Sequence, residues 1–292
     1  MHSGDSACAL PPQNLPSWVV EVIEAYTRAI AEALDVRGLI NVQFAVTGTT
    51  VYVIEANPRA SRTVPFVAKA TGVPLAKVAS RGMLGATLAE LRAEGLLRER
   101  SRHGYVAVKE AVLPFGRFPE VDPALGPEMR STGEVMGIDR TFGRAFFKAE
   151  LAAGTVLPTG GMVFLSLADG DKPAGIVVAK RLRELGMGIA ATTGTAAHLA
   201  RFGETVDLIV GKVSEGADLT AVELIADGKV SFVVNTPQGR GGRTDGEQIR
   251  KAANLHRVSS VTTVEAALAA VQGMAEQAGG AIDVRPLQSY HG

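Results

Sequence analysis

The second half of the chain alternates between short apolar runs and longer segments whose apolar residues recur at helical spacing. The short runs predict five strands, at residues 162–167, 188–191, 206–210, 231–235 and 258–261. The longer segments predict helices at residues 173–185, 196–202, 219–226, 246–255 and 264–272. Because strands and helices alternate, the pattern favours a doubly wound, parallel α/β sheet, in which ligands bind at the carboxyl ends of the strands.

Polar residues that suit a phosphate group stand at those strand ends. A Thr-Gly-Thr turn follows the second strand and leads directly into a helix, where hydroxyls and free N–H groups form an anion site. Taken singly, such a turn is usually a helix cap, and a lysine in a loop is usually solvated. Their joint placement predicts one phosphate pocket, formed by Lys172, Thr192, Thr195, Lys212, Asn235 and Thr236.

The first half contains a predicted β-hairpin. Its strands cover residues 39–46 and 50–57, with a turn signal at 47–49, and Pro58 ends the second strand. By the period of two, Val51, Val53, Glu55 and Asn57 are expected to share one face. A three-residue loop at 48–50 would then place residue 43 opposite residue 55.

This register brings Gln43, Glu55 and Asn57 together as three oxygen ligands. Hard oxygen donors with a single carboxylate suit Mg²⁺ that keeps water and nucleotide phosphates as its other ligands. A lone Glu-x-Asn is more often a solvated strand face, and Arg59 and Arg62 alone would usually be surface ion pairs of little energetic value. The hairpin register favours the metal site.

The run from Glu55 through Asn57-Pro58-Arg59 to Pro74 resembles the ATP-grasp metal site of carbamoyl phosphate synthetase large chains. Biotin-carboxylase-type relatives share the Glu-x-Asn-Pro-Arg core but not its continuation. A second signature, LGPEMRSTGEVMG at 125–137, agrees, and the resemblance covers nearly the whole chain. It implies a carbon–nitrogen ligase that hydrolyses glutamine and phosphorylates carbamate with ATP for arginine and pyrimidine biosynthesis.

The resemblance also assigns roles within the ATP site. Gln43, Glu55 and Asn57 would hold Mg²⁺ or Mn²⁺ on the ATP phosphates, and Arg59 and Arg62 would offset charge on the transferring phosphoryl group. ATP itself would be bound by His2, Ser3, Gln43 and Glu55.

The stretch from His2 to Pro11 resembles an internal segment of the second ATP-grasp domain. The chain is therefore expected to start within that domain, with the glycine-rich phosphate loop in a preceding amino-terminal part. That part, a small glutaminase subunit, ATP and carbamate are the expected partners. The 292-residue chain alone is expected to be inactive in catalysis.

The second half resembles the methylglyoxal-synthase-like domain that ends such large chains. That resemblance implies allosteric control, with UMP or IMP at the six strand-end residues and ornithine at Asp5, Glu110, Leu113 and Thr262. Two departures are visible, because residue 237 is proline where threonine is common, and residue 261 is valine where some members carry aspartate. The expected domains are 1–153, the ATP-grasp part, and 162–292, the allosteric part, joined by a linker at 154–161.

Composition adds limits to this interpretation. Lys+Arg and Asp+Glu both number 30, so a net charge of zero suggests neither nucleic acid nor an anionic membrane as partner. The single cysteine, Cys8, excludes an intramolecular disulfide and fits a reducing cytosol. No apolar run reaches the length of a membrane span and residues 1–7 do not resemble a signal peptide, so a cytoplasmic protein is predicted.

Two other functions stay open at this stage. The chain could be an isolated nucleotide-binding regulatory module without catalysis. It could also be a methylglyoxal synthase, whose acid/base carboxylate would have to be Asp169, Asp171 or Asp245, although none stands in the glycine-rich context of that family.

Overall fold

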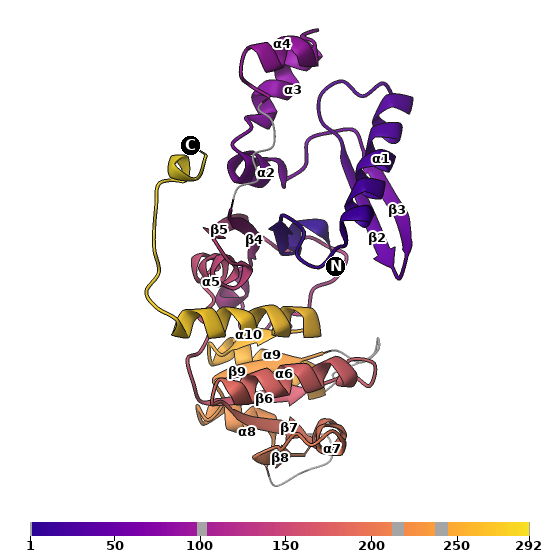
Figure 1. The fold of residues 1–292 in the computed structure, drawn as a ribbon. Helices are drawn as coiled ribbons and strands as arrows, with labels where there is room; N and C mark the ends of the chain where they lie inside the picture. The colour runs from indigo at the N-terminus through magenta and orange to yellow at the C-terminus, as the bar shows by residue number, and fades with distance from the viewer. Residues whose placement is uncertain (1, 98–103, 212–218, 237–244, 292) are drawn as a thin grey trace. The chain divides into compact units, whose positions relative to one another are not determined.

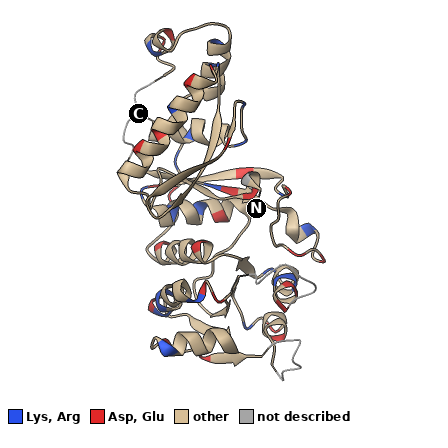
Figure 2. Ribbon diagram, turned by 90° about the vertical axis from the view of Figure 1, so that its right-hand side faces the viewer, with Lys and Arg blue, Asp and Glu red and all other residues tan. Residues whose placement is uncertain are grey.

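A computed structural model describes residues 2–97, 104–211, 219–236 and 245–291 of the chain (Figure 1). The chain divides into two compact units, one made of Met1–Cys8 with Val108–Asp283 and the other of Ala9–Ala107 with Val284–Gly292. Acidic and basic residues are interspersed along the helices (Figure 2). None of the helices in the described ranges is long and apolar enough to cross a membrane.

The unit built around Ala9–Ala107 contains a two-stranded antiparallel sheet, β2 (Asn41–Thr47) and β3 (Thr50–Asn57), with α1 (Ser17–Ala33) against β3. Three further helices follow, α2 (Val64–Thr71), α3 (Leu75–Met83) and α4 (Leu88–Ala93). Gly72 ends α2 with a φ of 70°, a conformation that glycine adopts without steric cost. Thr87 and Glu90 form a capping box that starts α4. The short 3₁₀ helix Leu287–Tyr290 also belongs to this unit.

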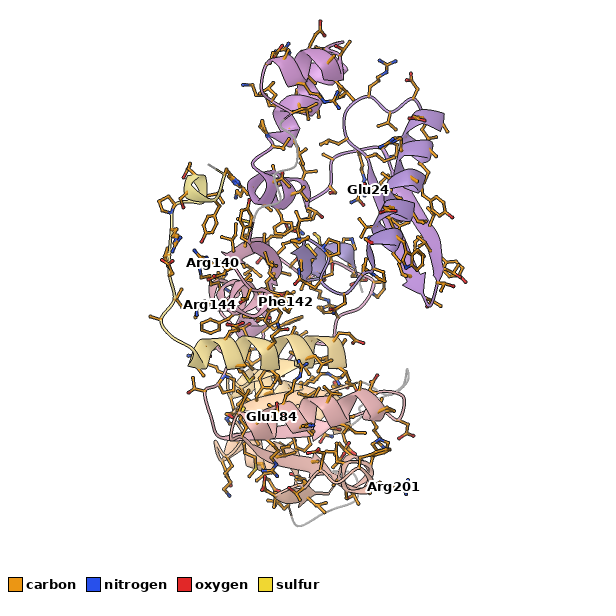
Figure 3. All side chains as sticks on the ribbon, in the orientation of Figure 1. Glu24, Arg140, Phe142, Arg144, Glu184 and Arg201 are labelled. Atoms are coloured by element: carbon orange, nitrogen blue, oxygen red, sulfur yellow. The ribbon has the colours of Figure 1, made fainter. Side chains whose placement is uncertain are left out.

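A three-stranded sheet has the order β1 (Cys8–Leu10), β4 (Val106–Val112), β5 (Gly133–Asp139). A 3₁₀ helix at Ser3–Asp5 precedes β1, and another, η2 at Pro114–Arg117, follows β4. Helix α5 (Phe142–Ala153) packs on β5, and Phe142 and Arg144 in its first turn are labelled in Figure 3. The helix begins where the Thr141 side chain accepts a hydrogen bond from the Arg144 amide. Gly137 permits this packing, because a Cβ there would lie 2.6 Å from the Ala149 nitrogen.

The five-stranded sheet is the doubly wound one that the sequence predicts. Its five strands are all parallel, in the order β10-β9-β6-β7-β8. The strands are β6 (Met162–Ser166), β7 (Gly188–Thr192), β8 (Leu208–Val210), β9 (Phe232–Asn235) and β10 (Ser259–Val261). The helices are α6 (Lys172–Glu184), α7 (Thr193–Arg201), α8 (Ala221–Ala226), α9 (Asp245–Leu255) and α10 (Val264–Ala278). All ten predicted elements are therefore confirmed, with ends that shift by up to six residues, the largest shift being the end of α10 at Ala278 rather than residue 272.

The core of this sheet explains its continuous apolar strands. Phe164 and Val233 are fully buried and pack with Leu224 of α8 and Ile249 of α9. On α10, residues that face inward contact both α5 and α6. Both faces of a parallel sheet are covered in this way, so its strands carry few polar residues except at their ends.

Candidate functional site

The hairpin places Gln43 opposite Glu55, as the sequence predicts, although its turn is different. Thr47 pairs with Thr50, so Gly48 and Thr49 form a two-residue turn rather than the expected three-residue loop. A β-bulge then shifts the register, because Phe44 pairs with Val53 while Gln43 pairs with Glu55. The bulge leaves one extra residue, Ile54, unpaired on β3. This residue produces the same Gln43–Glu55 pairing that a three-residue loop would have given.

The bulge corrects the prediction that Val51, Val53, Glu55 and Asn57 share one face. Paired residues lie on the same face, and Phe44 and Gln43 are neighbours on β2, so they point to opposite faces. Val53 therefore lies on the face opposite Glu55. A one-residue insertion reverses the alternation of every residue beyond it.

The resulting face carries four polar side chains from two strands. Asn41 pairs with Asn57 and Gln43 pairs with Glu55, and the Asn57 Nδ2 donates a hydrogen bond to Glu55 Oε1 at 2.9 Å. Asn41 was not among the predicted ligands, although its pairing with Asn57 follows from the hairpin register. One carboxylate and three amide oxygens form a donor set that suits a hard divalent cation. The described residues hold no group of three His, Cys, Asp or Glu side chains that would offer a rival metal site.

The two predicted arginines follow the hairpin and are both exposed. Arg59 uses its Nη1 to donate to the Ala60 carbonyl at 3.1 Å, which folds the side chain back on its own segment. Arg62 stands just before α2. Their contact with a phosphoryl group stays a prediction.

His2 and Ser3 belong to the other compact unit. The His2 Nδ1 accepts a hydrogen bond from the Gly4 amide at 3.0 Å, which fixes the ring on the 3₁₀ turn. Their joint action with Gln43 and Glu55 on one ATP molecule stays a prediction.

Three of the predicted ornithine residues, Asp5, Glu110 and Leu113, lie on the three-stranded sheet or close in sequence to one of its strands. Asp5 is buried and accepts hydrogen bonds from the amides of Arg130 and Ser131, both at 2.8 Å. Burial alone would raise the pKa of Asp5, but these hydrogen bonds outweigh it and hold the pKa below its ordinary value. Glu110 lies on β4, where burial raises its pKa, and Leu113 follows that strand. Thr262 stands at the carboxyl end of β10.

The second candidate site lies at the carboxyl ends of β6, β7 and β9. The hydroxyl of Thr195 accepts from the Leu167 amide at 3.1 Å, and the hydroxyl of Thr236 accepts from the Ala168 amide at 2.7 Å. Thr192 donates to the Thr195 hydroxyl at 3.1 Å. The sheet order reverses at β6, since β7 and β9 flank it, so the site stands at a topological switch point.

Lys172 brings a positive charge to the start of α7. A Cβ added at Gly194 would lie 3.4 Å from the Lys172 Nζ, so the amine reaches the first turn of that helix. The same Nζ forms an ion pair with Asp169 at 2.6 Å, and this contact lowers the pKa of Asp169. Lys212 and Pro237 lie outside the described residues. The structure thus places five of the six predicted residues at this edge of the sheet, Lys172, Thr192, Thr195, Asn235 and Thr236.

Sequence reasoning missed Arg250, which lies on α9 and donates from Nη1 to the side chain of Asn235 at 2.7 Å. Arg250 is only 5% exposed, which is rare for an arginine. An inward position on the predicted helix was the only signal in the sequence.

Comparison with known proteins agrees with both parts of this architecture. Residues 1–91 match the family described as "Carbamoyl-phosphate synthase L chain, ATP binding domain", and residues 175–262 match the "MGS-like domain" family. The chain therefore combines an ATP-binding region of the ATP-grasp type with a methylglyoxal-synthase-like domain. This combination of an ATP-grasp region with an MGS-like domain defines a class of multidomain proteins.

The curated relatives narrow that class. The chain is 50% identical over its full length to a carbamoyl phosphate synthase large chain of Archaeoglobus fulgidus, of which it covers 27%. It is 51% identical to the Streptomyces coelicolor large chain over 28% of that protein. It is also 50% identical, over 94% of its length, to a Methanopyrus kandleri protein named as the C-terminal section of this large chain, of which it covers 51%. The chain belongs to the family of carbamoyl phosphate synthase large chains and corresponds to their carboxyl-terminal part. It spans about a quarter of the length of the full-length relatives.

Proposed function

We propose that the chain supplies the metal-binding hairpin and the nucleotide-responsive domain of a large chain that forms carbamoyl phosphate from ATP and carbamate. The observation that supports this most is the polar hairpin face, where Asn41, Gln43, Glu55 and Asn57 come together by register. The proposal includes a preceding amino-terminal part and a small glutaminase subunit as partners, in arginine and pyrimidine biosynthesis.

In the proposed site, the chain's own residues would position and orient the metal ion and the ATP phosphates. The side-chain amide of Asn57 donates to Glu55 Oε1 and so restrains the carboxylate. Gln43 supplies an amide oxygen from the opposite strand. Mg²⁺ or Mn²⁺ held by Gln43, Glu55 and Asn57 would offset charge on the ATP phosphates. Arg59 and Arg62 add positive charge on the segment that follows, which favours an electron-rich phosphoryl group.

The experiment places substitutions in a full-length large chain that carries these residues. Glu55→Gln keeps the shape of the side chain and removes its charge, so carbamate-dependent ATP turnover should fall about 100-fold or more. Thr47→Ala is the matched control, since Thr47 lies on the same face of β2 at the turn end and is exposed. Near-normal turnover in the Glu55 variant would mean that the four side chains form only a solvated strand face.

The 292-residue chain alone should make no carbamoyl phosphate, because positioning supplies much of a phosphoryl-transfer rate and the chain spans only about a quarter of the length of the large chains it matches. Turnover close to that of a full enzyme would contradict this expectation.

We also propose that the strand-end pocket binds a nucleotide monophosphate such as UMP or IMP. The support is the grouping of Lys172, Thr192 and Thr195 at the start of α7, where backbone N–H groups and the helix dipole favour an anion. Thr236 binds the Ala168 amide, next to the Leu167 amide that Thr195 binds. Lys172→Ala removes a charge-assisted hydrogen bond worth about 1.5–3 kcal/mol, so affinity should fall about tenfold to a hundredfold. Calorimetric titration of the 292-residue chain measures this. Equal affinity in the variant would reject the pocket.

An isolated regulatory module would bind a nucleotide in this pocket and contribute nothing to catalysis. Loss of turnover in the Glu55→Gln variant of a full-length chain would therefore favour the catalytic role over this alternative. Ornithine binding at Asp5, Glu110, Leu113 and Thr262 is a further part of the proposal. A methylglyoxal synthase is less well supported, because Asp169 already forms an ion pair with Lys172.

A further inference from the structure

Arg250 joins two parts of the same compact unit that are far apart in sequence. Its Nη1 donates to the Asn235 Oδ1 at 2.7 Å. Its Nε and Nη2 donate to the two carboxylate oxygens of Asp122 at 2.8 Å and 2.6 Å. The guanidinium is thus bidentate on one side and bonded to an amide on the other, and it is nearly inaccessible to solvent.

The Asn235 end of this chain of contacts lies in the strand-end pocket. Asn235 is the last residue of β9 and is 2% exposed, and its neighbour Thr236 holds the Ala168 amide. Gly246 leaves space for the contact, because a Cβ there would lie 3.1 Å from both Arg250 Nη1 and Asn235 Oδ1. Any anion held at the end of β9 therefore comes close to the guanidinium.

The Asp122 end lies in the segment 113–132 that connects β4 to β5. Asp122 Oδ1 also accepts from the Ala124 amide at 3.0 Å, so the carboxylate shapes the loop around it. Burial would raise the pKa of Asp122, but the hydrogen bonds from Arg250 outweigh it and lower the pKa. The same segment ends at Arg130 and Ser131, whose amides bind Asp5.

We propose that Arg250 is a positioning residue that couples nucleotide occupancy of the strand-end pocket to the conformation of segment 113–132. This rests on the proposed nucleotide site. A phosphate near Asn235 is a second anion for a guanidinium that already binds Asp122, so the two compete for one buried charge. The pairing with Asp122 weakens when the phosphate is bound, and the effect is reciprocal by linkage.

The reciprocity gives a test at a residue outside the pocket. UMP and IMP are titrated calorimetrically into the 292-residue wild-type chain, Asp122→Asn, Arg250→Lys and the double variant. Asp122→Asn removes the competing charge, so it should bind the nucleotide about threefold to tenfold more tightly than wild type. In the Arg250→Lys background the same substitution should change the affinity less than twofold, since lysine cannot form the bidentate pair. Equal affinities of wild type and Asp122→Asn would overturn the proposal.

Hydrogen exchange reads the opposite direction of the coupling. Nucleotide at saturation should raise the exchange of amides in segment 113–132, including Ala124, in wild type but not in Arg250→Lys. Asn254→Ala is the matched control, because Asn254 Nδ2 donates to the Phe115 carbonyl at 3.1 Å from the same helix without binding Asn235. That variant should raise exchange near Phe115 and leave the nucleotide response at Ala124 as it is in wild type. A nucleotide response that persists in Arg250→Lys would contradict the role of Arg250.

A failure of the nucleotide site itself is distinguishable. If neither UMP nor IMP binds the wild type, the proposed regulatory function is wrong. The coupling between the end of β9 and segment 113–132 is then tested without a ligand, by hydrogen exchange of the Asn235→Ala variant. Loss of the Asn235 amide should raise exchange at Ala124 at least threefold, whereas exchange equal to wild type would reject the coupling. Far-ultraviolet circular dichroism confirms that each variant is folded.

Discussion

Gly143 on α5 faces Gln272 on α10 so closely that a Cβ at residue 143 would lie 2.8 Å from the Gln272 carbonyl oxygen. Gly273 on α10 is similarly confined, since a Cβ there would lie 3.0 Å from Leu157 Cδ1 and 3.3 Å from Phe146 Cδ1. These two glycines let the helices approach through their backbones. Because α10 also packs on α6, this approach fixes the three-stranded sheet against the five-stranded one within the same unit.

Gly143→Ala should therefore destabilise this unit. The added methyl group meets a backbone oxygen that cannot rotate away, so the free energy of unfolding should fall by about 1–3 kcal/mol, as for other overpacked sites. Urea denaturation followed by circular dichroism measures the change. Gly160→Ala is the control, because no heavy atom lies within 4 Å of a Cβ there. Unchanged stability in the Gly143 variant would mean that α5 and α10 can move apart at little cost.

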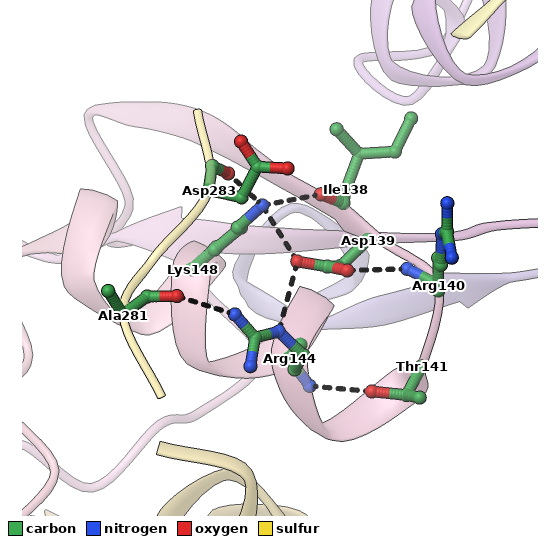
Figure 4. A network of polar contacts seen from close by, with 8 residues as sticks. All are labelled: Ile138, Asp139, Arg140, Thr141, Arg144, Lys148, Ala281 and Asp283. Carbon is green, nitrogen blue, oxygen red and sulfur yellow. Dashed lines mark hydrogen bonds and ion pairs between the residues drawn. The ribbon is translucent and has the colours of Figure 1, made fainter. Parts of the chain in front are cut away.

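A second contact involves the residues that follow α10. Lys148 on α5 donates to the carbonyls of Ile138 and Asp283 and forms an ion pair with Asp139 at 2.8 Å (Figure 4). Arg144 adds a hydrogen bond to the Ala281 carbonyl at 2.7 Å. Side-chain groups of α5 therefore hold the backbone of residues 281–283.

Lys148→Met should release part of that segment. The substitution removes the contacts of the Lys148 amine with three acceptors, so the free energy of unfolding should fall by about 1–3 kcal/mol. Amide hydrogen exchange at residues 281–285 should rise. Lys229→Met is the matched control, because the Lys229–Asp227 pair has side chains that are 59% and 56% exposed. Such an exposed pair contributes about 0–1 kcal/mol. If both variants lose the same stability, the Lys148 contacts contribute no more than a surface ion pair.

Glu150 on α5 predicts a pH dependence. Its burial raises its pKa to about 7, and the nearby carboxylate of Glu110 adds to that effect. The unfolded chain has a lower carboxyl pKa, about 4.3, so between these values the folded state binds the additional proton. The stabilisation is complete below about pH 4 and is lost as pH rises to about 7.

Glu150→Gln should remove this slope. The variant is neutral at every pH, so between about pH 5 and pH 8 its free energy of unfolding should fall less than that of wild type, by about 1–3 kcal/mol. Urea denaturation at several pH values measures both slopes. Parallel curves for the two proteins would show that Glu150 titrates near its ordinary pKa.

The hairpin and Arg250 show what the sequence could and could not predict. The sequence predicts that Gln43 pairs with Glu55 across a three-residue loop. The structure has the same pairing, but a two-residue turn and a bulge produce it. A bulge has no strong sequence signal. For that reason the prediction that Val51 and Val53 share a face with Glu55 is wrong. The parallel sheet was predictable because its buried strands are local apolar runs. The Arg250–Asp122 pair joins residues 128 positions apart, and no local pattern encodes such a contact.

Thr236 connects the fold of the strand-end pocket with its proposed ligand. Its hydroxyl accepts from the Ala168 amide, and the hydroxyl hydrogen can then donate to a phosphate oxygen. Thr236→Val keeps the shape but leaves the Ala168 amide without its acceptor, which should cost about 1–3 kcal/mol of stability and about tenfold in UMP or IMP affinity. Thr236→Ser retains the hydroxyl and should keep affinity within about twofold of wild type. Calorimetric titration and urea denaturation of the three proteins separate the two effects. A valine variant that loses stability but binds nucleotide with wild-type affinity would restrict Thr236 to a structural role.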